Sequence, residues 1–199
     1  DSIYGYGSYE ICDDPYFTPM RLPLLDRGVV YVVAHIRGGG EMGRQWYEDG
    51  RLLKKKNTFS DFVAASRHLI DTGLVDGERL AAEGRSAGGL LMGAVTNLAP
   101  ELYRVILAGV PFVDALTTIL KPELPLTAGE WEEWGNPITS KEVYEYMASY
   151  SPYENIRAER YPAILAVTSL NDVRVSYLEP TKWVQELREV VADDSGLCL

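Results

Sequence analysis

Residues 79–92 read RLAAEGRSAGGLLM, and this stretch decides the fold of the chain. It predicts a short strand, a sharp turn and then an apolar helix. The turn, Gly84-x-Ser86-x-Gly88, has the form of a nucleophile elbow, in which a serine lies on a strand-to-helix turn with its hydroxyl exposed. Small neighbours keep side chains away from that backbone, and the helix presents its positive end where an oxyanion would form. The alternative is a Gly-rich turn that only packs a strand against a helix.

Length and composition limit the number of domains and the classes of partner that the chain can have. The chain has 199 residues, of which 46% are hydrophobic and 24% charged, enough for one domain with a substantial core. The net charge of −10 argues against a nucleic-acid surface, and no apolar run is long enough to cross a membrane, so we expect neither partner. Cys12 and Cys198 lack metal-type spacing, which favours a reduced, cytoplasmic protein without a metal.

The hydrophobic pattern predicts alternating strands and helices. After a strand that ends near Tyr4, we expect strands at Val29–Ile36, before the elbow, at Tyr103–Val110 and at Tyr161–Thr168. Helices are expected at Asn57–Asp71, capped by Asn57 or Thr58, and at Ser86–Leu98, Lys141–Tyr150 and Ser176–Val191. Residues 114–136 read as an irregular insertion. Such alternation predicts an α/β domain with a mostly parallel sheet and helices on both faces.

Four unusual stretches each follow a predicted strand. They are Tyr4–Ser8, Arg37–Glu41, Gly84–Gly88 and Ser169–Arg174. The carboxyl ends of parallel strands share one edge of a sheet, and ligand chemistry in such folds lies beyond that edge. The sequence therefore predicts that these stretches form one site.

Ser86 is the candidate nucleophile of that site. A serine needs a base to take its proton and an acid to orient the base. Asp172 follows a late strand, where the orienting acid belongs, although an Asx turn or a helix cap would explain it too. The only histidines, His35 and His68, precede Ser86, so we interpret His35 as a wall residue and His68 as a surface residue. No histidine follows Asp172, and the triad is incomplete in this chain.

Several motifs together resemble the catalytic domain of the prolyl oligopeptidase family, above all its oligopeptidase B branch. They are GYGSYE at 5–10, HIRGGGEMG at 35–43, GRSAGG at 84–89, GVPFVD at 109–114 and EWEEWGNP at 130–137. The resemblance covers nearly the whole chain. It implies an α/β-hydrolase fold and, in a full-length parent, an N-terminal β-propeller domain. Residues 1–199 would then be a partial catalytic domain, cut at both ends, without the propeller and the histidine loop.

The resemblance also assigns catalytic roles. Ser86 would be the nucleophile and Asp172 the orienting acid. The Tyr6 hydroxyl and the backbone N–H of Ala87 would donate to the oxyanion. Ser169 departs from the family pattern, which more often has glycine there.

Substrate contacts follow from the same resemblance. Arg174 would anchor the substrate backbone, and Phe112 would line the pocket for the P1 side chain. Glu130, assisted by Glu132, would pair with a P1 arginine or lysine, a charge-assisted contact of favourable geometry. From the residues alone, positions 130–133 would read as a solvated acidic turn.

The sequence thus predicts a serine-type endopeptidase domain that hydrolyses short basic peptides through an acyl-enzyme, without a cofactor. One alternative is an esterase-like α/β-hydrolase. Another is a non-catalytic fragment or binding module, which the missing histidine favours. Nucleotide binding is disfavoured because neither Gly-rich loop has the spacing of a phosphate loop or a dinucleotide fingerprint.

Overall fold

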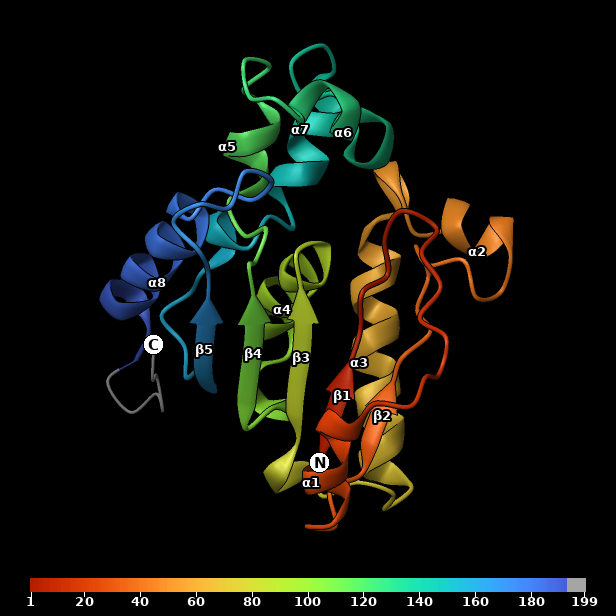
Figure 1. Cartoon of the computed structure of the whole chain (residues 1–199). Coiled ribbons are helices and arrows are strands. Elements are labelled where there is room, and N and C mark those ends of the chain that lie inside the picture. Colours follow the sequence, from red (N-terminus) through yellow and green to blue (C-terminus); the bar gives the residue numbers. More distant parts are fainter. Residues whose placement is uncertain (193–199) are drawn as a thin grey trace.

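The computed structural model describes residues 1–192 and contains one sheet of five parallel strands, in the order β2-β1-β3-β4-β5 (Figure 1). The strands are β1 (Ser2–Tyr4), β2 (Tyr31–Val33), β3 (Ala81–Arg85), β4 (Val105–Gly109) and β5 (Ala163–Val167). Ile3 lies opposite Val32 on one side and Ala82 on the other, which places β1 between strands that come later in the chain. The predicted parallel α/β architecture is confirmed.

The helices are α1 (Leu22–Leu25), α2 (Arg44–Glu48), α3 (Lys56–Asp71), α4 (Ala87–Leu98), α5 (Ala115–Ile119), α6 (Thr127–Trp134), α7 (Lys141–Ala148) and α8 (Leu178–Val190). In Figure 1, α3 and α4 lie behind the sheet and α8 lies beside β5. Helices α5, α6 and α7 gather beyond the carboxyl ends of the strands, over the edge where the site is expected.

Helix α4 is the centre of the hydrophobic core. Eleven of its residues are buried, which fits a helix enclosed by the sheet on one side and α3 on another. Alternate strand residues point toward it, among them the fully buried Ala82 and Ile106. Burial of one such aliphatic side chain contributes about 1.5–3 kcal/mol. This packing fixes α4, and with it the turn that precedes α4.

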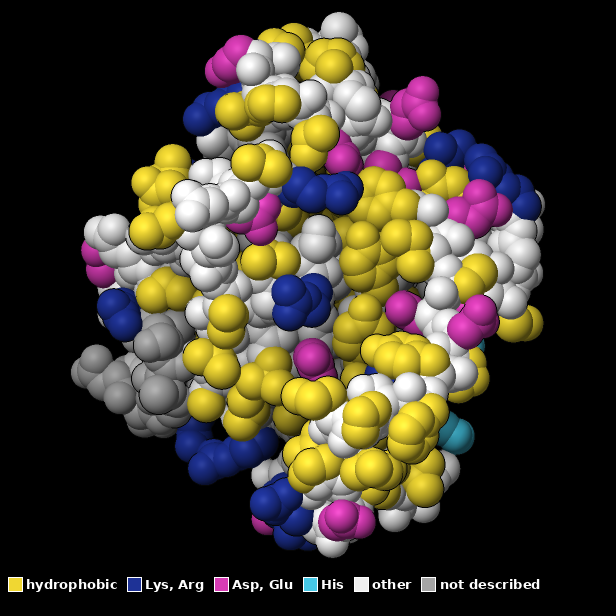
Figure 2. All heavy atoms as spheres, in the orientation of Figure 1, with side chains coloured by type: hydrophobic (Ala, Val, Ile, Leu, Met, Phe, Trp, Pro, Cys, Tyr) yellow, Lys and Arg dark blue, Asp and Glu magenta, His cyan; other side chains and the backbone are white. Residues whose placement is uncertain are grey.

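The opposite face of the sheet is more open in the described part of the chain. Glu83 is half-buried, and Arg85, Leu165 and Val167 are exposed on it. Figure 2 shows this face, where hydrophobic side chains lie beside separate basic and acidic ones. Of the helices, α3 and α4 cover the other face of the sheet (Figure 1).

Two predicted segments differ from the structure. The apolar run Val29–Ile36 was expected to be a strand buried on both faces, but β2 is shorter, half-buried and at an edge of the described sheet. Residues 114–136 were expected to be irregular, but they contain α5 and α6. The prolines between these two helices, Pro122 and Pro125, interrupt the periodicity, so the hydrophobic pattern did not predict either helix.

The predicted cap of α3 is also wrong. The helix begins at Lys56, and no side chain caps it. Thr58 instead donates from its hydroxyl to the carbonyl of Arg37 at 2.7 Å, and the Asn57 amide donates to the carbonyl of Asp49 at 2.8 Å. Thr58 thus ties the start of α3 to the loop that follows β2, and Asn57 ties it to the end of α2.

The glycines of the elbow are required by close backbone contact. A Cβ on Gly84 would lie 2.2 Å from the carbonyl oxygen of Gly88, and backbone cannot move as a side chain can. We expect Gly84→Ala to lower the free energy of unfolding by about 3 kcal/mol or more, as measured by urea denaturation. Gly129→Ala is the matched control, because a Cβ there meets nothing within 4 Å. Equal stability of the two variants would contradict the tight elbow.

Candidate active site

Ser86 lies between β3 and α4 with a strained backbone. Its φ is 57° and its ψ is −114°, in the left-handed half of conformational space where a residue with a Cβ is rare. The surrounding structure holds it: the Ser86 N–H donates to the carbonyl of Gly109 at 2.9 Å, and its carbonyl accepts from the N–H of Phe112 at 3.2 Å. Such strain is concentrated at functional sites. This geometry fits the predicted elbow.

Further strained residues lie at the same edge of the sheet. Tyr9 and Glu10 have φ values of 60° and 59° in the segment after β1, and Val110 has a φ of 38° directly after β4. A β-branched residue in this region is a true outlier. The Val110 N–H donates to the carbonyl of Val167 at 2.6 Å. The strained residues therefore lie at the carboxyl ends of the strands, where the sequence predicts the site.

Tyr6 lies against the first turn of α4. A Cβ built on Gly88 would be 3.4 Å from Cδ2 of the Tyr6 ring, an ordinary contact, and 2.7 Å from the carbonyl oxygen of Gly5, so the backbone that leads into Tyr6 requires the glycine. Burial is the main cause that raises the pKa of Tyr6, and the carboxylates of Glu130 and Glu133 raise it further while Arg174 opposes them. The phenol is therefore a neutral donor at neutral pH. Tyr6 thus lies near the N-terminal end of α4, where Ala87 is buried, and the role of these two residues as oxyanion donors stays a prediction.

Glu130 is held at one carboxylate oxygen. The Tyr9 hydroxyl donates to its Oε2 at 2.5 Å, and the Trp134 indole N–H donates to the same oxygen at 2.9 Å. Within residues 1–192 no hydrogen bond occupies its Oε1. The buried Phe112 ring packs on Trp134 at 5.6 Å between ring centroids. Because Phe112 also donates its N–H to Ser86, this aromatic pair connects Glu130 to the elbow.

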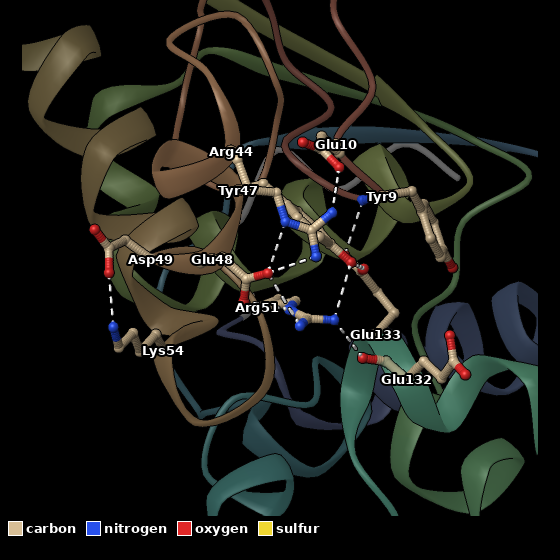
Figure 3. Close-up of polar contacts among 10 residues, drawn as sticks. All are labelled: Tyr9, Glu10, Arg44, Tyr47, Glu48, Asp49, Arg51, Lys54, Glu132 and Glu133. Atoms are coloured by element: carbon tan, nitrogen blue, oxygen red, sulfur yellow. Dashed lines mark hydrogen bonds and ion pairs between the residues drawn. The ribbon is translucent and has the colours of Figure 1, made fainter.

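Glu133 is a buried acid that was not predicted, and its side chain is only 3% exposed. Its Oε1 accepts from the Tyr9 N–H at 2.9 Å and its Oε2 from the Tyr47 hydroxyl at 2.6 Å (Figure 3). Arg51 donates to the carbonyl of Glu132 at 3.2 Å, whereas the Glu132 side chain is exposed. Positions 130–133 are thus part of a helix with one buried acid and not a solvated turn. No local pattern in the sequence distinguishes Glu133 from the acids beside it.

Asp172 forms an Asx turn after β5. Its Oδ1 accepts from the N–H groups of Arg174 at 2.9 Å and Val175 at 3.0 Å. The bond from Val175, followed by that from Arg174, holds the pKa of Asp172 below its ordinary value. No hydrogen bond joins Asp172 to Ser86 in the described part of the chain. The Arg174 side chain is exposed, and its charge acts on the phenol of Tyr6.

The two histidines lie away from the elbow. His68 is exposed on α3, as predicted. His35 was expected to be a wall residue but is also exposed, with Nε2 3.0 Å from the carbonyl oxygen of Asp13. Neither ring contacts Ser86 within residues 1–192. The base predicted for the serine is therefore not one of these two side chains.

In residues 1–192 no three His, Cys, Asp or Glu side chains are grouped so that they could hold a metal ion. None of the helices found in this part of the chain combines the length and apolar character needed to span a bilayer. Cys12 is exposed and unpaired, and Cys198 lies outside the described residues.

Comparison with known proteins supports the resemblance. The model of the prolyl oligopeptidase family matches residues 15–197. Protease 2 of Moraxella lacunata is 54% identical over 197 residues, covering 99% of this chain and 28% of the relative. Dipeptidyl aminopeptidase BI of Pseudoxanthomonas mexicana is 54% identical over 187 residues, covering 94% of this chain and 26% of the relative.

A solved structure agrees. Oligopeptidase B of Trypanosoma brucei, with covalently bound antipain, superposes with a TM-score of 0.96 at 54% identity, over 100% of this chain and 28% of that chain. The chain thus spans less than a third of the length of these relatives. The family match and the shared fold lead to one conclusion: this chain belongs to the prolyl oligopeptidase family.

Proposed function

We propose that this chain forms part of the catalytic domain of a serine peptidase of the oligopeptidase B type, which cleaves short peptides after arginine or lysine. The observation that carries the proposal is the strained Ser86 at the elbow. Covalently bound antipain in the T. brucei relative also fits a nucleophilic site. The chain spans 28% of Protease 2, so we place it within a longer protein that supplies the remaining parts, including a propeller.

The proposed chemistry is acyl transfer. The Ser86 Oγ attacks the carbonyl carbon of the scissile bond while a base takes its proton. The resulting oxyanion accepts hydrogen bonds from the Tyr6 hydroxyl and the Ala87 N–H. The base then protonates the departing amine as the C–N bond breaks, and a water molecule hydrolyses the ester on Ser86. Asp172 would orient the base, which we assign to an imidazole outside residues 1–199.

Specificity would come from Glu130. Its free Oε1 gives a guanidinium or ammonium group a charged acceptor beside Trp134 and Phe112. Exposed Glu132 would add negative charge nearby, and Arg174 would hold the substrate backbone. An esterase-like hydrolase would need no such carboxylate contact. A non-catalytic module would not need the strained serine.

The role of Asp172 tests the proposal. In the full-length protein that contains this chain, Asp172→Asn should lower kcat for an arginyl peptide by about 10³–10⁴-fold, because the amide cannot stabilise the charged base. The asparagine oxygen can still accept both backbone N–H groups, so the melting temperature should change by only about 1–2 °C. Asn171→Ala is the control, since Asn171 is an exposed neighbour. Full activity of Asp172→Asn would rule out this assignment.

The lowered pKa of Asp172 determines how this residue's contribution to folding stability changes with pH. The two backbone N–H groups favour the ionised form, so the carboxylate keeps its charge to lower pH than an ordinary aspartate. Its contribution to folding is present at neutral pH and is lost only as pH falls through the lowered pKa.

A further inference from the structure

Lys55 is a buried lysine that the proposed chemistry leaves without a role. It directly precedes α3, and its side chain is 1% exposed, whereas Lys54 and Lys56 on either side are exposed. Buried lysines are rare because an ammonium loses its hydration. The lysine run itself gives no hint of burial. Its burial therefore requires specific partners.

Those partners belong to the segment that follows Tyr6. The Lys55 Nζ donates to the carbonyl of Gly7 at 2.6 Å and to the hydroxyl of Ser8 at 2.8 Å. It also lies over the Trp134 ring, 5.1 Å from the centroid. Two hydrogen bonds from one cation thus hold the two residues directly after Tyr6.

Other hydrogen bonds hold the segment Gly5–Tyr9 on both sides of Tyr6. On the N-terminal side of Tyr6, the Gly5 N–H donates to the carbonyl of Glu83 at 3.1 Å, in continuation of the sheet. On the C-terminal side, the Tyr9 N–H is held by Glu133. Lys55 supplies the charged contacts in between. Burial lowers the pKa of Lys55 to about 7, and the Glu133 carboxylate partly offsets that change, so these contacts are charged at and below neutral pH.

We infer that Lys55 is a positioning residue, whose ammonium fixes Gly7 and Ser8 and thereby aims the Tyr6 hydroxyl at the oxyanion. The inference rests on the proposed function, because it acts through the oxyanion donor named there. A lysine that served only for packing would differ from a positioning residue in the effect of its replacement on kcat. If Lys55 served only the stability of the fold, its replacement by methionine would leave the Gly7 carbonyl without this donor and lower the free energy of unfolding, but kcat of the folded variant would be unchanged.

The test compares Lys55→Met, Tyr6→Phe and the double variant in the full-length protein that contains this chain. Loss of two charge-assisted hydrogen bonds should lower kcat by about 10–100-fold with KM within about twofold. Tyr6→Phe should lower kcat by about 100–1000-fold. If Lys55 acts through Tyr6, the double variant is no slower than Tyr6→Phe alone. Lys56→Met is the control and should retain wild-type kcat.

Two results would overturn the inference. One is a folded Lys55→Met protein with kcat within twofold of wild type. The other is an unchanged effect of Lys55→Met when Tyr6 is already phenylalanine. If Lys55→Met fails to fold, Ser8→Ala is tested in its place, because it removes one of the two acceptors of Lys55. Ser8→Ala should lower kcat about threefold to tenfold through Tyr6. An unchanged kcat in this variant would contradict the inference. Absence of any Ser86-dependent hydrolysis by the wild type would instead refute the proposed function, and this inference with it.

Discussion

Ser86→Ala is expected to lower kcat/KM for peptide hydrolysis by about 10⁵–10⁶-fold, the largest effect of any substitution in this chain. Without the Oγ no acyl-enzyme forms, and only the residual effect of binding and the oxyanion donors remains. The fold should be unaffected, because alanine keeps the Cβ and the same positive φ of 57°. Steady-state kinetics and a thermal melt of the full-length protein measure both.

A second serine variant and a labelling experiment test whether the loss of activity is specific to Ser86. Ser60 is exposed on α3, and Ser60→Ala should keep wild-type kinetics. A fluorophosphonate should label the wild type at Ser86 and leave Ser86→Ala unmodified, as read by peptide mass spectrometry. Retention of more than a tenth of the activity in Ser86→Ala would mean that another group is the nucleophile.

Glu130→Gln is expected to lower kcat/KM for an arginyl peptide by about 100–1000-fold and to change that for a phenylalanyl peptide by less than about threefold. Removal of one partner from a hydrogen-bonded charge pair that the bound substrate shields from water costs about 2–5 kcal/mol, and the amide keeps the shape but not the charge. The glutamine oxygen can still accept from Tyr9 and Trp134, so the pocket should stay intact. The ratio of the two kcat/KM values is the measurement.

Two comparisons make the result specific. Glu132→Gln should have a smaller effect, about tenfold or less, because its side chain is exposed and screened. Glu142→Gln, on the exposed surface of α7, should have none. An equal fall for arginyl and phenylalanyl peptides in Glu130→Gln would show that Glu130 supports the structure and does not select the substrate.

The local parts of the fold could be predicted from the sequence. The elbow is encoded within five residues, Gly84 to Gly88, because the close contact and the strained serine leave little choice of residue. The parallel sheet followed from the alternation of strands and helices. Helices α5 and α6 could not be predicted, because the two prolines between them break the periodicity of the segment.

The charged parts of the site were hidden for a different reason. Lys55 stands in a run of three lysines, and Glu133 in a run of acids between tryptophans, so composition suggests solvated side chains in both places. Their burial depends on where Gly7, Tyr9 and Tyr47 lie in space. Such partners, 48, 124 and 86 positions away, are set by the tertiary fold and not by local pattern.

The most direct test of the central claim is the hydrolysis of N-terminally blocked fluorogenic peptides that differ only in P1, by the full-length protein that contains this chain. Our account predicts that arginine and lysine at P1 give kcat/KM values at least about 100-fold above proline or phenylalanine. It also predicts that blocked peptides are cleaved, which separates endopeptidase action from dipeptide release at a free N-terminus. Preference for proline or phenylalanine, or no cleavage of any blocked peptide, would contradict the account.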